Sequence, residues 1–157
     1  MHVGGVLLAV TAVEDNHFER GAAVDAERVL RGLLADARRT SRSIGLVPTM
    51  GALHAGHARL IEQARRECQV VVVSIFVNPT QFDRQSDLSS YPRDLQGDIQ
   101  KLGGAGADAV FIPEAGAIYP EGFQTYVVPG NLGEHLCGRS RPGHFRGVCT
   151  VVSILFR

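Results

Sequence analysis

The sequence predicts an α/β fold in which a mainly parallel sheet is flanked by helices. Three observations support this class: apolar stretches of strand length, amphipathic stretches with helical spacing, and regular alternation of the two. The clearest strand is VVVVSIFV, residues 70–77, because a continuous β-branched run is typical of a strand buried on both faces. Alternating strands and helices form a parallel sheet through right-handed crossovers.

The first elements follow from spacing and stop signals. Apolar residues recur at helical intervals over 26–37, and Arg38 and Arg39 follow where the helix dipole favours positive charge. The stretch IGLVP, residues 44–48, predicts a short buried strand that closes at its proline. Residues 57–67 carry an apolar stripe and predict a helix. This order leads directly into the central strand.

The second half continues the alternation with shorter elements. Residues 78–93 are polar and are expected to form a long loop. The remaining elements are expected in this order: a helix over about 94–102 ended by the glycine-rich 103–108, strands at 109–113 and 125–128, and a helix from about 145. We place residues 1–157 in one domain, with 1–23 as a short strand or a poorly defined leader.

Composition argues against several functional classes. A chain of 157 residues with 45% hydrophobic and 20% charged residues is an ordinary globular domain. Sixteen basic and sixteen acidic residues cancel, so we expect no binding to nucleic acid or to an anionic membrane. The apolar stretch at 3–10 is too short to span a bilayer. A local anion site is compatible with this balance.

The cysteines are typical of a reducing compartment. Cys68, Cys137 and Cys149 are odd in number and far apart, and they match neither a zinc pattern nor a disulfide framework. We interpret them as reduced thiols of a cytoplasmic protein. The sequence assigns no metal ligands.

An H-x-G-H pair stands where a strand leads into a helix. His54 and His57 lie in PTMGALHAGH, residues 48–57, at the carboxyl end of a predicted strand. Unpaired N–H groups and the helix dipole favour an anion there, above all phosphate. Gly51 and Gly56 allow close backbone approach, and the imidazoles add side-chain donors. The alternative is two ordinary surface or capping histidines.

A second candidate lies at the same edge of the sheet. Gln81 follows the strand at 70–77, and its side-chain amide can both donate and accept, which suits a hydroxy acid. The alternative is a solvated loop glutamine. Asn78 is a weaker candidate, because Asn-Pro is a common turn starter.

Four blocks of sequence resemble the pantothenate synthetase (pantoate–β-alanine ligase) family. The blocks are PTMGALHAGH (48–57), VVVSIFVNPTQF (71–82), DLSSYPRDL (87–95) and RPGHFRGVCTVV (141–152). H-x-G-H alone indicates only the wider superfamily of Rossmann-like nucleotidyltransferases, whereas four blocks in the family's order are specific. The resemblance implies a Rossmann-like N-terminal domain of that superfamily.

The resemblance also implies a two-step reaction with ATP and Mg²⁺. ATP and pantoate would give pantoyl adenylate and pyrophosphate, and β-alanine would then displace AMP to give pantothenate. His57 matches the residue usually assigned as proton donor, and His54 would share stabilisation of the α-phosphate. We expect bound triphosphate to favour the imidazolium form. The residues implied in ATP binding are Met50, Gly51, Ala52, Leu53, His54, Ala55, Gly56 and His57.

The same resemblance assigns a pantoate site. Gln81 would bind pantoate and later β-alanine, and apolar side chains would contact the dimethyl group. The residues implied are Gln81, Pro48, Met50, Val151 and Val152, with Phe76 and Phe82 as further apolar candidates. Tyr91 would lie in a lid and contact phosphate. Arg141 and His144 would contact phosphate or a second subunit, the alternative being a solvated basic loop.

The chain also departs from the family. Ser86-Asp87 stands where Glu-Asp is common, and the segments that follow in the family, including its C-terminal domain, are absent. We therefore expect an N-terminal part that is weak or inactive alone and that forms a homodimer. One alternative is a noncatalytic fragment that binds ATP and pantoate or dimerises. Another is a nucleotidyltransferase for a different substrate, which the NPTQF and RPGHF stretches oppose.

Overall fold

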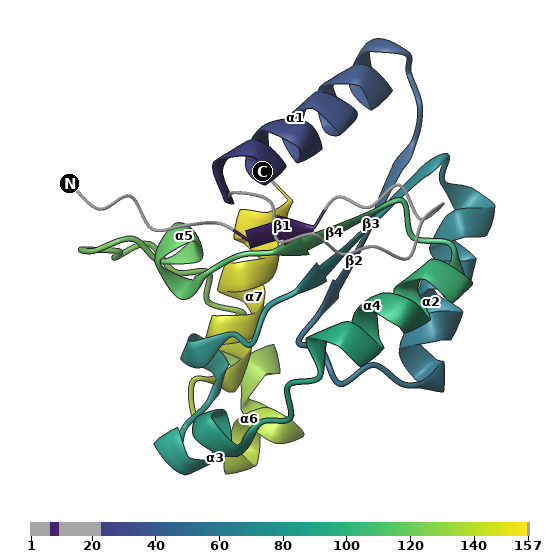
Figure 1. Ribbon diagram of the computed structural model, residues 1–157. Helices are drawn as coiled ribbons and strands as arrows, with labels where there is room; N and C mark the ends of the chain where they lie inside the picture. Colours follow the sequence, from purple (N-terminus) through teal and green to yellow (C-terminus); the bar gives the residue numbers. More distant parts are fainter. Residues whose placement is uncertain (1–6, 10–22, 157) are drawn as a thin grey trace.

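The computed structural model describes residues 7–9 and 23–156, and these form a four-stranded sheet with helices on both faces (Figure 1). The strands are β1 (Leu7–Ala9), β2 (Ile44–Thr49), β3 (Val70–Ile75) and β4 (Ala109–Ile112), in the order β1-β4-β3-β2. β2 pairs parallel with β3, and β3 pairs parallel with β4. β1 is antiparallel to β4. The mainly parallel sheet is confirmed, and β1 is a short strand in the stretch 1–23, for which the sequence left a strand or a leader open.

The two faces of the sheet have separate cores. Val71, Val73 and Ile75 point to the face covered by α2 (Ala55–Glu67) and α4 (Leu95–Ala105). Val70 and Val72 point to the opposite face, which α1 (Ala23–Arg39) covers. All six residues of β3 are buried, as expected for a central parallel strand.

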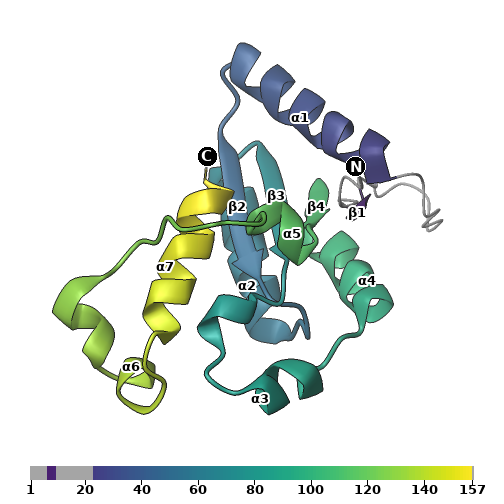
Figure 2. The same ribbon diagram turned by 90° about the vertical axis from the view of Figure 1, so that its left-hand side faces the viewer.

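A third core cluster extends the α1 face beyond the carboxyl end of β3. Phe76 packs there with Ile118 and Val151, the last from α7 (His144–Leu155). Figure 2 shows α7 beside the sheet and α3 below it. The short helices are η1 (Pro79–Gln81), α3 (Gln85–Ser90), α5 (Ala115–Ile118), η2 (Gly130–Glu134) and α6 (Cys137–Ser140). α7 therefore reaches the edge of the sheet at which β2 and β3 end.

Two expectations were wrong. Residues 78–93 are not one long loop, because η1 and α3 form within them; Asn78 caps η1 through its side chain. Residues 125–128 form no strand in this structure. The Val127 N–H instead donates to the Thr150 hydroxyl of α7 at 3.0 Å, so the segment lies against a helix and its β-branched residues have no strand to pair with. The glycine-rich stop is confirmed: α4 ends at Gly106 in the left-handed region, at φ 90°.

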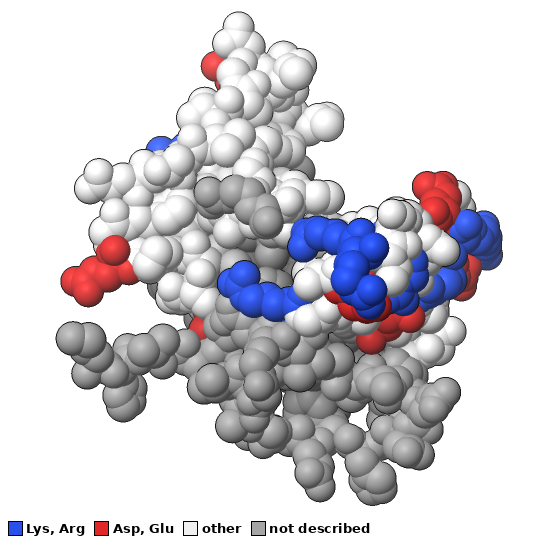
Figure 3. All heavy atoms as spheres, turned by 90° about the horizontal axis from the view of Figure 1, so that it is seen from above, with Lys and Arg blue, Asp and Glu red and all other residues white. Residues whose placement is uncertain are grey.

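The face of the molecule that is seen from above in Figure 3 carries charges of both signs. Asp36, for example, pairs with Arg39 at 2.6 Å and also with Arg42. In the described part of the chain, no helix is long and apolar enough to cross a membrane.

Candidate active site

The two histidines sit at the first turn of α2, directly after β2. His54 is the N-cap, and its Nδ1 accepts the Gly56 N–H at 3.1 Å. His57 Nδ1 accepts the His54 N–H at 3.3 Å, which completes a reciprocal capping box. The ring centroids lie 4.2 Å apart. Because each Nδ1 accepts a hydrogen bond, the proton of each neutral ring is on Nε2.

Gly56 makes room for this arrangement. A Cβ at Gly56 would lie 2.9 Å from His54 Cε1, so any other residue would push the ring from its capping position. The capping alternative considered for the sequence is thus borne out for the Nδ1 atoms. The Nε2 donors take no part in the capping box.

Burial, and then the neighbouring His54 ring, lower the pKa of His57 below its usual value. The Asp98 carboxylate acts in the opposite direction, but it does not outweigh the other two. The neutral form of His57 is therefore favoured, in agreement with its Nδ1 acting as acceptor.

Most backbone N–H groups of this turn already have partners. Within residues 51–57, all of which the structure describes, only the Ala55 N–H has no acceptor in the protein. The expectation of several free N–H groups facing an anion was therefore wrong, because the capping box and a buried carboxylate satisfy them. The donors that this turn leaves for an anion are the two Nε2 groups and the Ala55 N–H, at the positive end of the helix dipole.

That carboxylate belongs to Asp98, which sequence reasoning missed. Its side chain is only 2% exposed, and it accepts from Ala52 N at 2.8 Å and Leu53 N at 2.7 Å. A signal was present: Asp98 falls on the apolar face of α4 with Leu95 and Leu102, three and four residues away. An acidic residue on a buried face needs a partner.

The residues expected to bind pantoate converge on one cavity of about 280 Å³. It lies where β2, β3 and α7 meet, with both apolar and polar walls. The lining residues are Pro48, Thr49, Met50, His57, Phe76, Asn78, Gln81, Tyr91, Val148, Val151, Val152 and Leu155. Five predicted pantoate residues and His57 thus share a site although they are distant in sequence.

Asn78 fixes the position of Gln81 in this cavity. It is 1% exposed, and its Nδ2 donates to Gln81 Oε1 at 3.0 Å and to the Gly147 carbonyl of α7 at 3.1 Å. Its Oδ1 accepts from the Tyr119 hydroxyl at 2.8 Å. Tyr119 was not singled out from the sequence. Gln81 Nε2 approaches the Met50 sulfur at 3.0 Å. Asn78 is therefore both a turn starter and a support for the site.

A second cavity of about 280 Å³ adjoins the first and shares Met50, Gln81 and Tyr91 with it. Its other lining residues are Phe82, Asp87, Ser90, Pro92, Arg141 and His144. His144 Nδ1 lies 3.0 Å from the Gln81 carbonyl oxygen. Tyr91 packs edge-on against Phe82, and burial raises the pKa of its hydroxyl. The structure thus brings Tyr91, Arg141 and His144 to one side of Gln81.

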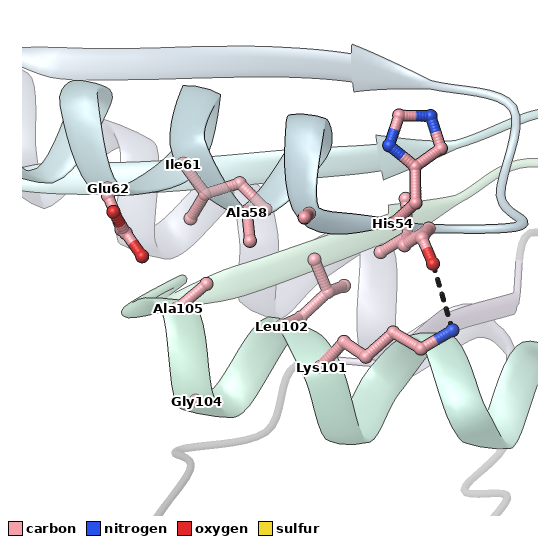
Figure 4. Close-up of a pocket in the computed structure, with 10 residues that line it drawn as sticks. His54, Ala58, Ile61, Glu62, Lys101, Leu102, Gly104 and Ala105 are labelled. Atoms are coloured by element: carbon pink, nitrogen blue, oxygen red, sulfur yellow. Dashed lines mark hydrogen bonds between the residues drawn. The ribbon is translucent and has the colours of Figure 1, made fainter.

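Three predicted ATP residues, Leu53, His54 and Ala55, border a different pocket, between α2 and α4 (Figure 4). This pocket has a volume of about 340 Å³, and Lys101 lies along one wall with its Nζ donating to the Leu53 carbonyl at 2.9 Å. His54 borders this pocket, but Figure 4 shows its ring pointing away from α4. His57, not His54, faces the cavity that holds Gln81.

Within the residues that the structure describes, no group of three or more His, Cys, Asp or Glu side chains could hold a metal ion. Both oxygens of Asp98, the buried carboxylate nearest the turn, already accept backbone N–H groups. These side chains therefore form no metal cage of their own.

A parallel sheet with H-x-G-H at the start of a crossover helix defines a domain of the Rossmann-like nucleotidyltransferase class. The chain belongs to the pantoate-beta-alanine ligase family, whose family model matches residues 23–157. Pantothenate synthetase from Geobacter sulfurreducens is 53% identical over 133 residues, which are 85% of this chain and 47% of the relative. The enzyme from Deinococcus radiodurans is 62% identical over 109 residues, 69% of this chain and 39% of the relative.

Solved structures agree with this assignment. A pantothenate synthetase from Thermus thermophilus is 54% identical with a TM-score of 0.69. The match covers 73% of this chain and 42% of the Thermus chain. A pantoate-beta-alanine ligase from Francisella tularensis, complexed with beta-gamma ATP and beta-alanine, is 50% identical with a TM-score of 0.70. The match covers 74% of this chain and 45% of the Francisella chain. The chain spans less than half the length of these relatives.

Proposed function

We propose that this chain contributes the pantoate and α-phosphate part of the active site for ATP-dependent condensation of pantoate with β-alanine. The observation that carries this proposal is the cavity that joins His57 to Gln81, Met50 and Val151. A glutamine amide suits the hydroxyl and carboxylate of a hydroxy acid, and the valine side suits its methyl groups. The Francisella relative, with its ATP and β-alanine ligands, supports the same substrates.

The proposed first step forms an acyl adenylate. A pantoate carboxylate oxygen attacks the α-phosphorus of ATP, a new O–P bond forms, and the bond to pyrophosphate breaks. Negative charge grows on the phosphoryl oxygens, and the Nε2–H of His57, supported by His54, would stabilise it. In the second step the amine of β-alanine attacks the acyl carbon and AMP leaves, which gives pantothenate.

Mg²⁺ enters this proposal with ATP as part of the substrate. Since the described side chains form no metal cage, triphosphate oxygens and water molecules would supply most of its ligands. Met50, Gly51, Ala52, Leu53, Ala55 and Gly56 would shape the turn beneath the phosphates, with Ala55 N–H as the backbone donor. Tyr91, Arg141 and His144 would approach the substrates from the adjoining cavity.

Calorimetry with pantoate and with Mg·ATP tests the proposal directly. We expect the 157-residue chain to bind both, and Gln81→Ala to weaken pantoate binding, whereas Gln96→Ala on the exposed face of α4 should not. His57→Ala should weaken ATP binding, with exposed His135→Ala as its control. A folded chain that binds neither ligand would contradict the proposal.

Pantoate-dependent ATP–pyrophosphate exchange tests the chemistry. Because the chain spans less than half the length of its relatives, we propose that exchange by this chain alone is weak or undetectable. Exchange at the rate of a full-length relative measured alongside would show that these residues suffice. Binding without exchange would instead favour a noncatalytic ligand-binding fragment.

We also propose that the chain forms a homodimer. Large apolar side chains are exposed at several positions of the segment before α7: Val127 40%, Val128 69%, Leu132 82% and Leu136 87%. Exposed apolar patches of this kind mark association surfaces. Analytical ultracentrifugation of the chain and of Val128→Ser should show a dimer that the substitution weakens.

A cytoplasmic location is proposed on the three unpaired thiols.

A further inference from the structure

Asp98 links α4 to the turn that carries the histidines. Its two carboxylate oxygens accept the N–H groups of consecutive residues, Ala52 at 2.8 Å and Leu53 at 2.7 Å. Charge-assisted hydrogen bonds of this length are stronger than neutral ones, and the carboxylate is almost fully buried. The Lys101 ammonium lies 3.6 Å from the same carboxylate and binds the Leu53 carbonyl (Figure 4). Two side chains of α4 therefore hold three backbone groups of the turn.

The turn needs such a support because its backbone is unfavourable. Gly51 and Ala52 both adopt positive φ, 82° and 52°, and this region is unfavourable for alanine because its Cβ crowds the backbone. A Cβ at Gly51 would lie 3.0 Å from Asp98 Oδ2, so glycine also lets the carboxylate approach. Without the carboxylate, two buried N–H groups would lose their acceptor and the left-handed pair would lose its restraint.

The backbone that Asp98 holds leads directly into the histidine capping box. Leu53 directly precedes the N-cap His54, so the path of the backbone at Leu53 sets where the capping box begins. That box in turn keeps the proton of each neutral ring on Nε2, as described above.

We propose that Asp98 is a positioning residue, which holds the 51–53 backbone so that the Nε2 donors of His54 and His57 face the bound phosphates. This inference rests on the proposed function for its effect on ATP, and on the hydrogen bonds alone for its effect on the imidazoles. Asp98 does not contact substrate in this role. Lys101 supports it from the same helix.

Asp98→Asn tests the proposal, because the amide keeps the shape but places an N–H donor against a backbone N–H. Nitrogen-15 NMR of the histidines should show the Nε2–H tautomer in the unaltered chain and a mixture of tautomers in the variant. ATP affinity should fall about tenfold, the loss expected for one hydrogen bond to a charged group. Pantoate affinity should change less than about threefold, since η1 and α7 support Gln81.

Asp94→Asn is the matched control. Asp94 caps the same helix through Gly97 N at 3.0 Å and is exposed, and asparagine caps equally well. The control should keep the wild-type tautomers and ATP affinity. Unchanged tautomers and affinity in Asp98→Asn would overturn the proposal. If the unaltered chain binds no ATP, the proposed function fails, while the tautomers still decide the role of Asp98.

Amide hydrogen exchange of the unaltered chain covers the case in which Asp98→Asn does not fold. The Ala52 and Leu53 amides should be protected although they lie outside any helix or strand. Exchange as fast as in an open loop would overturn the proposal. Lys101→Met removes the bond to the Leu53 carbonyl and the ion pair with Asp98, but it leaves the carboxylate that accepts the Ala52 and Leu53 N–H groups. It should therefore reduce this protection less than Asp98→Asn does.

Discussion

Two turns meet at the candidate site, and they are held in opposite ways. The histidine turn (residues 50–57) follows β2, and the glutamine turn (residues 78–82) follows β3, which pairs with β2 in register. In the histidine turn the two imidazoles are held by bonds between residues two or three apart, and Asp98 and Lys101 of α4 hold the backbone of Ala52 and Leu53. The glutamine turn depends on Tyr119, His144 and Gly147, which lie 39 to 69 residues later.

This difference separates substitutions that should act only on the imidazoles from substitutions that should also destabilise the fold. A change at the capping pair can disturb the imidazoles while the fold stays intact, because the bonds that hold the rings join residues two or three apart. A change in the glutamine turn separates η1 from α7 and should lower stability and substrate binding together. The following predictions test that contrast.

Gly147→Ala should have the largest effect. A Cβ there would lie 2.5 Å from the Thr80 carbonyl oxygen and 2.7 Å from Gln81 N, and backbone atoms cannot turn aside. We expect the free energy of unfolding to fall by about 3 kcal/mol, as in overpacked cores, with loss of pantoate binding. Urea unfolding and calorimetry measure both. Gly104→Ala, with open space around its Cβ, is the control, and equal stability of both variants would refute close packing at Gly147.

Asn78→Ala should come next. It removes the Asn78 bonds to the Tyr119 hydroxyl and the Gly147 carbonyl and releases Gln81, so that the Tyr119 hydroxyl keeps only its contact with Thr80. The expected loss is about 2 kcal/mol in the free energy of unfolding, together with weaker pantoate binding. Tyr119→Phe removes only the hydroxyl contacts and should cost about 1 kcal/mol. If Tyr119→Phe proved the more damaging of the two, Asn78 would not be the centre of this network.

Gly56→Ala should separate function from stability. Alanine stabilises a helix by about 1 kcal/mol relative to glycine. This gain offsets the stability that is lost when the His54 ring is displaced from its capping position. We therefore expect the free energy of unfolding to stay within about 1 kcal/mol of wild type while ATP affinity drops about tenfold. Calorimetry and urea unfolding of one sample decide this. Unchanged ATP affinity would mean that the His54 ring position is irrelevant.

The smallest effect should be the pH dependence due to His57. Its pKa is lowered on folding, so the unfolded chain binds more protons as pH falls through 6.5, and stability decreases in that window. His57→Gln should flatten this decrease, as measured by urea unfolding on either side of that pH. Bound ATP should raise the pKa of His57, which an NMR titration with and without nucleotide can detect. An unchanged pH slope in His57→Gln would show that other groups cause it.

Much of the fold could be predicted from short-range pattern. The β-branched run of β3, the amphipathic stripes of α1 and α2, and the glycine stop of α4 reflect burial and backbone freedom, which depend on residue type and spacing. The strand expected at 125–128 failed because strand propensity needs a partner strand. In this chain the partner of that segment is α7.

The local pattern of the histidine turn, with its glycines and its capping pair after a strand, lies within about one helical turn and could be recognised in the sequence. The motifs also predicted residues that the fold brings together around Gln81. The folded structure was needed to place His57, and not His54, in the cavity with Gln81, and to bring Asp98 and Asn78 against the two turns. These contacts join segments far apart in the chain, and no local spacing encodes a contact that exists only after the sheet has formed.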